Sequence, residues 1–177
     1  MVQVLEVGED HRFRKHFGFD PIAIIRALYR IAFSIRLEGA STIEQQYVRS
    51  CTGRTDISLT RKIEEISIAI LLSLTSRKND IAYSYLAHAY FGEDAIGYKY
   101  AQMALTNNPH TPCMDTEELS AIIAMLKHPM PRKINGEWVK RHARRTRHIH
   151  QRFLKINSAN NSLEADVHEE PHPQLEH

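Results

Sequence analysis

Apolar residues recur at helical spacing in one segment after another, and this pattern limits the fold more than any other feature of the chain. From Pro21 to Leu37 they return every three or four residues, and Gly39 stands where that helix should end. The same spacing predicts further helices from "STIEQQ" onward and over Ser58–Leu74, Asp80–Phe91, Ile96–Leu105, Asp115–Lys127 and Trp138–Phe153. An alternating strand pattern occurs only at Val2–Val7. We therefore expect a mainly α protein.

The length and the charge distribution predict one domain followed by a tail. A chain of 177 residues can build one sizeable core but not two comfortable ones. Residues 127–155 include ten Lys or Arg and one acid, whereas residues 156–177 include five acids and neither Lys nor Arg. We expect a domain over residues 1–155 and a disordered acidic tail over residues 156–177, whose end resembles a vector-derived segment.

The basic segment can serve a phosphorylated substrate, an anionic lipid surface or a nucleic acid. We expect no nucleic acid as partner, because the arginines from Arg141 to Arg152 are spread around the predicted helix and few aromatic residues lie among them. Two cysteines, Cys51 and Cys113, make neither a disulfide framework nor a metal motif. No apolar run has the length of a membrane span.

Three short polar runs stand out beside the predicted helices. They are "EDHRFRKHFGFD" at 9–20, "GASTIEQQ" at 39–46 and "RKIEE" at 61–65. Taken singly, each run has an ordinary structural explanation, as a helix cap, a loop histidine or a surface ion pair. Either Ser41 or Thr42 could cap the helix that follows, because each has a Glu or Gln three residues later.

In this order the three runs resemble successive motifs of the peptidoglycan glycosyltransferases. This family, glycosyltransferase family 51, supplies the transglycosylase domain of bifunctional penicillin-binding proteins and the monofunctional glycan polymerases. Its first motif, E-D-x-x-F-x-x-H-x-G-x-D, is matched by Glu9, Asp10, Phe13, His16, Gly18 and Asp20. Its second, G-x-S-T-I-T-Q-Q, is matched by Gly39, Ser41, Thr42, Ile43, Gln45 and Gln46. Its third, R-K-x-x-E, is matched by Arg61, Lys62 and Glu65, and a weaker likeness continues to Arg144 and Arg145.

Three positions depart from the family's pattern. Glu44 replaces the usual threonine, Ala87 replaces an asparagine, and Ile31 stands where an asparagine is common. We expect Glu44 to add a negative charge beside a cleft that should receive a diphosphate.

The resemblance implies a lysozyme-like helical domain of two lobes with a cleft between them. It also implies that the chain polymerises peptidoglycan from lipid II, through inverting attack of a sugar 4-hydroxyl on the anomeric carbon of a lipid-diphosphate donor. Glu9 corresponds to the general base. Glu65, the second catalytic carboxylate, orients the groups around it or helps to hold a divalent cation, Mg²⁺ or Mn²⁺. The substrate-binding residues that the resemblance implies are Asp10, Phe13, His16, Ser41, Thr42, Gln45, Gln46, Arg49, Arg61 and Lys62.

The implied partners are lipid II, the growing glycan strand and other cell-wall synthesis proteins. The stretch from Phe17 to Arg36 combines apolar residues with arginines, so we also expect contact with an anionic membrane surface. The implied location is the outer, periplasmic face of the bacterial inner membrane, with the family's membrane helix upstream of this start. Two alternatives remain. One is a degenerate, weakly active or non-catalytic member that binds lipid-linked precursor or wall-synthesis partners, and the other is a lysozyme-type enzyme that cleaves glycan.

Overall fold

The structure is a computed structural model, and it describes residues 1–33, 40–54, 56–93, 95–106 and 114–168. The elements follow one another as α1 (Val2–Glu9), a 3-10 turn (Phe13–Lys15), α2 (Pro21–Ala32), α3 (Ile43–Thr52), α4 (Leu59–Thr75), α5 (Lys78–His88), β1 (Tyr90–Gly92), β2 (Ala95–Ile96), α6 (Tyr98–Thr106), α7 (Thr116–Lys127) and α8 (Gly136–His168). The prediction of a mainly α protein is therefore confirmed.

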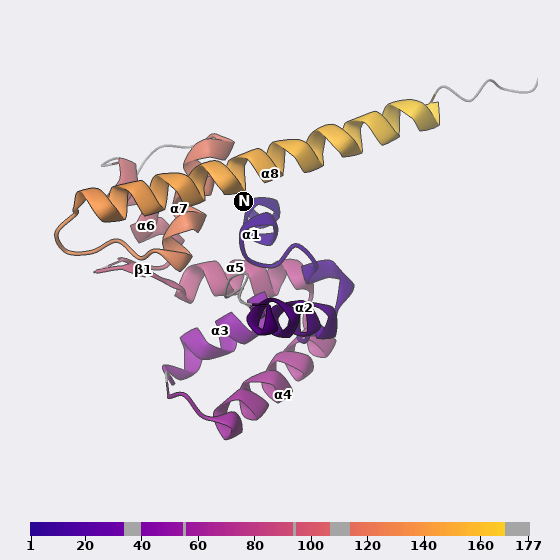
Figure 1. The fold of residues 1–177 in the computed structure, drawn as a ribbon, viewed down its shortest axis with the longest axis vertical. Coiled ribbons are helices and arrows are strands. Elements are labelled where there is room, and N and C mark those ends of the chain that lie inside the picture. The colour runs from indigo at the N-terminus through magenta and orange to yellow at the C-terminus, as the bar shows by residue number, and fades with distance from the viewer. Residues whose placement is uncertain (34–39, 55, 94, 107–113, 169–177) are drawn as a thin grey trace, which may run out of the picture.

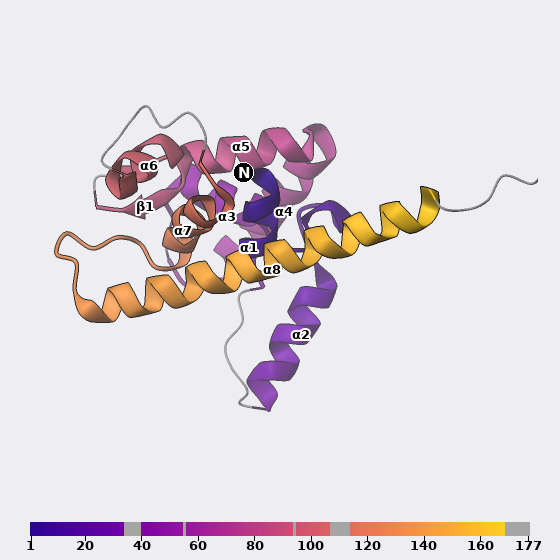
Figure 2. The same cartoon turned by 90° about the horizontal axis from the view of Figure 1, so that it is seen from above.

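Helix α1 lies at the centre of the molecule. It packs against α5, α7 and α8, and both views place it between α5 and α8 (Figures 1 and 2). Its Val4 and Leu5 are buried in a core that also includes Phe13, Phe91 and Ile149. Because Glu9 is the last residue of α1, this packing fixes where the first residue of the first motif lies.

The expected strand at Val2–Val7 is wrong, since these residues form most of α1. Val2, Val4 and Val7 have β-branched side chains, which favour strands locally. Tertiary packing overrides that preference, because in a helix all three valines are buried on the face that meets the core.

The disordered tail expected from Ile156 is wrong in its first part, because α8 continues from Gly136 to His168. Neither Gly nor Pro occurs between Gly136 and Pro171, so nothing in the backbone chemistry ends the helix near Phe153. The last turns extend beyond the body of the molecule in both views (Figures 1 and 2). Residues 169–177, including the segment that resembles a vector end, lie outside the described residues.

Helices α3, α4 and α5 form a second group. Helix α3 packs on α4 and α5, and both α3 and α4 lie on the side of α5 away from α8 (Figure 1). Thr42, not Ser41, is the N-cap of α3, because its hydroxyl accepts from the Gln45 N–H at 3.3 Å. Ser58 caps α4 in the same way.

Helix α2 extends away from the helical body (Figure 2). Five large apolar side chains here are at least half exposed, and they are Phe17 in the preceding loop and Ile22, Ile25, Tyr29 and Phe33. Within the residues described, no helix combines the length and hydropathy that crossing a membrane requires.

Candidate active site

The Glu9 carboxylate is held from two sides. Gln46 of α3 donates from Nε2 to Glu9 Oε2 at 3.3 Å, and Arg145 of α8 donates from Nη2 to Glu9 Oε1 at 3.2 Å. The side chain is only 12% exposed. Burial raises the pKa of Glu9 above its ordinary value, while the Arg145 charge and the hydrogen bond from Gln46 oppose that rise. A carboxylate with a raised pKa is a better proton acceptor than an ordinary one.

Glu65 of α4 is surrounded by cations. Arg49 of α3 binds it with both nitrogens of its fork, at 3.0 and 2.9 Å, and Arg61 and Lys62 approach at 2.5 and 2.8 Å. Burial alone raises the pKa of Glu65, but the hydrogen bonds and charges of Arg49 and Lys62 outweigh it, so the net pKa is lowered. Glu65 is therefore ionised, and it holds three basic side chains in one cluster.

A divalent cation does not fit beside Glu65 in this arrangement. Both carboxylate oxygens already accept hydrogen bonds from cationic donors, and a metal ion would have to displace them. The same donors would repel it.

Lys62 joins the second and third motifs. Its Nζ donates to Gln45 Oε1 at 2.6 Å and to Ser41 Oγ at 3.2 Å, in addition to Glu65. Because both Arg49 and Lys62 remain about one third exposed, their charges can also reach a bound anion. The structure thus brings together Ser41, Gln45, Arg49, Arg61 and Lys62, as the motifs imply.

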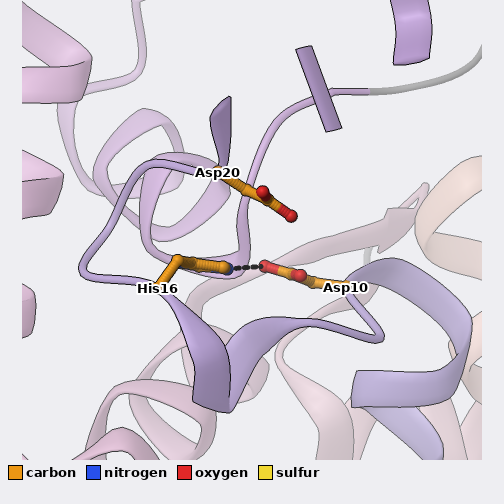
Figure 3. A group of neighbouring side chains, drawn as sticks. All are labelled: Asp10, His16 and Asp20. Carbon is orange, nitrogen blue, oxygen red and sulfur yellow. Dashed lines mark hydrogen bonds and ion pairs between the residues drawn. The ribbon is translucent and has the colours of Figure 1, made fainter. Parts of the chain in front are cut away.

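The remaining residues of the first motif hold the loop between α1 and α2. His16 Nε2 lies 2.9 Å from Asp10 Oδ2 (Figure 3). Asp10 also accepts from the backbone N–H of Ile43 at 3.3 Å. Phe13 is fully buried. The side chains of Thr42 and Gln45 both donate to the Gly18 carbonyl at 3.0 Å. These contacts fix the loop that follows Glu9.

Asp10, His16 and Asp20 place three potential metal ligands within 4.8 Å of one another (Figure 3). Each carboxylate is already satisfied by the protein, however. Asp20 accepts from the backbone N–H groups of Ile22 and Ala23 and from Arg12 Nε at 2.9 Å. The lowered pKa of Asp20, where these hydrogen bonds outweigh the effect of burial, agrees with a helix cap.

A cavity of about 800 Å³ opens beside Glu9. Of the residues that the motifs single out, Glu9, Ser41, Gln46, Arg49 and Arg145 line it. Glu65 is not among the lining residues, and it contacts the cavity through its partner Arg49.

Six lining residues carry charge or can carry it and were not singled out by the motifs: His11, Arg26, Arg30, Lys127, His148 and Arg152. Two signals in the sequence could have found all of them except His11. Arg26 and Arg30 are four residues apart in α2, which puts them on one helical face. The lining residues on α7 and α8 belong to the basic segment at 127–155. Its excess of positive charge is visible in the sequence, but the sequence does not show which side chains face the cavity. The cavity is therefore strongly cationic around one buried carboxylate.

The expectation for Glu44 is wrong, because this residue does not line the cavity. Its side chain is fully buried and forms an ion pair with Lys78 of α5. Lys78 also donates to the His16 carbonyl at 2.7 Å and lies 4.6 Å from the centre of the Phe13 ring. Glu44 therefore serves the loop that follows Glu9 and adds no charge to the site. Ala87 is exposed at the end of α5, and the Ile31 side chain lies outside the described residues.

The fold and this site define a helical domain built around one buried carboxylate and a cationic cavity. The model of the transglycosylase family matches residues 1–153, and the chain belongs to that family. It is 31% identical over 133 residues to a monofunctional glycosyltransferase of Staphylococcus saprophyticus, an alignment that covers 72% of this chain and 49% of the relative. A second such enzyme, from Staphylococcus aureus strain Newman, is 38% identical over 121 residues, covering 66% of this chain and 45% of the relative.

The family also includes larger relatives. Penicillin-binding protein 1A of Rickettsia typhi is 30% identical to this chain over 157 residues, which cover 86% of this chain and 20% of the relative. The chain thus spans about half the length of the monofunctional relatives and a fifth of the penicillin-binding protein.

Proposed function

We propose that this chain polymerises peptidoglycan glycan strands from lipid II. The observation that carries the proposal is a buried carboxylate of raised pKa, Glu9, in the wall of a cavity whose other charged side chains are basic. A reaction that takes a proton from a hydroxyl and releases a diphosphate needs these two features together.

In the proposed reaction, Glu9 accepts the proton of an acceptor sugar 4-hydroxyl. The hydroxyl oxygen forms a bond to the anomeric carbon of the donor from the face opposite the leaving group, so the configuration inverts. The bond from that carbon to the diphosphate oxygen breaks, and its electron pair leaves with the diphosphate. Arg49, which lines the cavity and is held in place by Glu65, supplies hydrogen bonds and positive charge where the leaving group becomes more negative. Lys62, whose three donors already bind Ser41, Gln45 and Glu65, adds positive charge from behind.

The structure bears on both alternatives. A lysozyme-type hydrolase needs a second carboxyl group that acts as acid, base or nucleophile. Both carboxylate oxygens of Glu65 are bound by the cationic side chains of Arg49, Arg61 and Lys62, so neither oxygen is free to act on a sugar. A degenerate member was suggested by Glu44 and Ala87. The ion pair of Glu44 with Lys78 removes the first reason, and Ala87 is not among the residues that line the cavity.

We further propose that the chain works at the outer face of the cytoplasmic membrane, where its partners would be lipid II, the growing glycan strand and other wall-synthesis proteins. The exposed apolar side chains of α2 and Phe17 support contact with the lipid surface from which the substrate would enter. Arg26 and Arg30 on the same helix would favour anionic lipid.

The test is incubation of the full chain with lipid II in detergent, followed by separation of the glycan products by length. We expect a ladder of glycan polymers whose lengths do not decrease with time. Pre-formed glycan added to the reaction should likewise not be shortened. Release of disaccharide from pre-formed glycan would favour the hydrolase, and lipid II binding without product would favour the degenerate member.

A further inference from the structure

A chain of two hydrogen bonds leads from Tyr85 to Glu9. Tyr85 lies on α5, is 4% exposed, and donates from its hydroxyl to Gln46 Oε1 at 2.7 Å. Gln46 in turn donates from Nε2 to Glu9 Oε2 at 3.3 Å. We infer that Tyr85 is a positioning residue for the base: it holds the oxygen of the Gln46 amide, turns the amide nitrogen toward Glu9 and so favours the ionised carboxylate. This inference rests on the proposed role of Glu9.

The direction of the two hydrogen bonds follows from the chemistry of the groups that make them. An amide accepts at its oxygen and donates at its nitrogen, so fixing one end decides what the other end offers. Burial, together with the nearby Glu9 charge, raises the pKa of Tyr85 far above its ordinary value, so the hydroxyl keeps its proton. Tyr85 therefore donates to Gln46, and Gln46 donates to Glu9.

If both hydrogen bonds were reversed, the Tyr85 hydroxyl would lose its acceptor. Arg145 donates to Glu9 Oε1, which leaves Oε2 as the oxygen to be protonated. A Glu9 protonated at Oε2 would donate to the amide oxygen, and the amide nitrogen would then face Tyr85. The tyrosine proton would need a new acceptor, and among the described residues Gln46 Oε1 is the acceptor that its hydroxyl reaches. The chain is thus matched to the carboxylate and not to the carboxylic acid.

This preference matters because Glu9 must be ionised before it can take a proton. Burial works against ionisation, and the hydrogen bond from Gln46 works for it. Tyr85 is not among the residues that line the cavity, so it acts on the base without contacting substrate.

The first test is Tyr85→Phe, which removes only the hydroxyl. We expect the acid limb of the pH profile of kcat/KM with lipid II to move up by about 0.5 to 1 pH unit, with little change at the alkaline plateau. The pKa of Glu9, read by NMR titration of its labelled side-chain carboxyl carbon, should rise by the same amount. Tyr83→Phe is the matched control, because Tyr83 lies on the same helix and is 53% exposed. It should change neither quantity.

The second test is Gln46→Met, which removes the amide that links Tyr85 to Glu9. This variant also provides a test if Tyr85→Phe folds poorly. We expect Gln46→Met to raise the pKa of Glu9, and adding Tyr85→Phe to raise it no further. The inference would be overturned if Tyr85→Phe left the pKa of Glu9 unchanged. It would also be overturned if adding Tyr85→Phe to Gln46→Met raised the pKa of Glu9 as much as Tyr85→Phe does alone. Failure of the proposed function would look different: Glu9→Gln would then keep near-normal polymerisation, whereas the NMR titration would still report whether Tyr85 acts on Glu9.

Discussion

Glu9 carries its charge in a place that water scarcely reaches, and this has a consequence for stability. A carboxyl group whose pKa is raised in the folded state ionises at a lower pH in the unfolded chain. The folded state therefore loses stability as the pH rises from about 4.5, the ordinary pKa, to the raised pKa of the folded state. We expect the change in Tm caused by Glu9→Gln to be more favourable to the variant at pH 7 than near pH 3.5, because only the unmodified chain loses stability across that range. Thermal unfolding followed by circular dichroism across that range measures it. A change in Tm that is the same at both pH values would contradict the ionisation argument.

The same substitution should remove most turnover. General-base catalysis contributes about 100-fold to 10,000-fold, so kcat for lipid II polymerisation should fall by a factor in that range. Glu137→Gln is a suitable control, since Glu137 is an acid whose side chain is 76% exposed at the start of α8. A Glu9→Gln variant that polymerises normally would show that another base is at work.

Glu44 belongs to a buried ion pair, and removing one member of such a pair costs about 3–5 kcal/mol. We therefore expect Glu44→Thr, which restores the family's usual residue, to lower the free energy of unfolding by roughly that amount. Lipid II binding by the folded variant should be unchanged, because Glu44 lies outside the cavity. Denaturant unfolding and a binding titration on the same variant test both statements. Tighter binding of lipid II would mean that the Glu44 charge reaches the site after all.

Among the elements, the loop between α1 and α2 passes α4 so closely that it requires glycine. Gly18 has a φ of 73°, and a Cβ there would lie 2.2 Å from the Ala69 carbonyl oxygen. Gly53, the C-cap of α3, has a similar φ of 63°, but within the described part of the chain no atom beyond its chain neighbours lies within 4 Å of the position of a Cβ. Gly53→Ala should cost about 1–2 kcal/mol, the price of its left-handed backbone. Gly18→Ala should cost clearly more, because the backbone of α4 must also move.

Helix α2 is the element that we expect to meet lipid. Burying an isoleucine side chain in an apolar phase contributes about 1.5–3 kcal/mol, and Ile25 is 67% exposed. Ile25→Gln should therefore weaken partitioning onto anionic vesicles about tenfold, and added salt should weaken it further for the unmodified chain. Ile96→Gln on β2 is the matched control, since Ile96 is 61% exposed on a different element. Equal losses in both variants, or no sedimentation with vesicles at low salt, would argue against α2 as the contact.

Most helices could be predicted from the sequence because their apolar spacing and caps are local signals. The capping signal at "STIEQQ" did not decide between Ser41 and Thr42. Thr42 is favoured by a tertiary contact, because its hydroxyl also donates to the Gly18 carbonyl. The valines of α1 misled for a related reason: their packing against α7 and α8 depends on residues more than a hundred positions away. The partner of Glu44 was equally hidden, because nothing local connects it with Lys78.

At the scale of the whole molecule, the cavity gathers charge from helices that are distant in sequence. Lys127 of α7 and Arg152 of α8 join Arg49 of α3 in its wall. The motifs identified Glu9 and Arg49, but the contribution of α7 and α8 depends on how the basic segment folds back onto α1. That could not be predicted without the tertiary structure.

This collective charge should act mainly on binding. An exposed charge pair contributes about 0.2–1 kcal/mol, so Lys127→Gln should raise KM for lipid II by about 1.4-fold to fivefold and leave kcat nearly unchanged. The rise should shrink at high salt, because screening already weakens the interaction there. Lys133→Gln is the control, since Lys133 is exposed and does not line the cavity. A large fall in kcat for Lys127→Gln would assign this residue to the chemical step.

The contact between Arg145 and Glu9 joins residues 136 positions apart in the chain. During synthesis α1 leaves the ribosome before α8, which follows only after nearly all of residues 1–153 have been translated. Until then Glu9 lacks the guanidinium that partly offsets its burial, and the cavity lacks its α8 wall. A nascent or prematurely ended chain therefore cannot assemble the site, so the order of translation itself delays activity until the domain is complete.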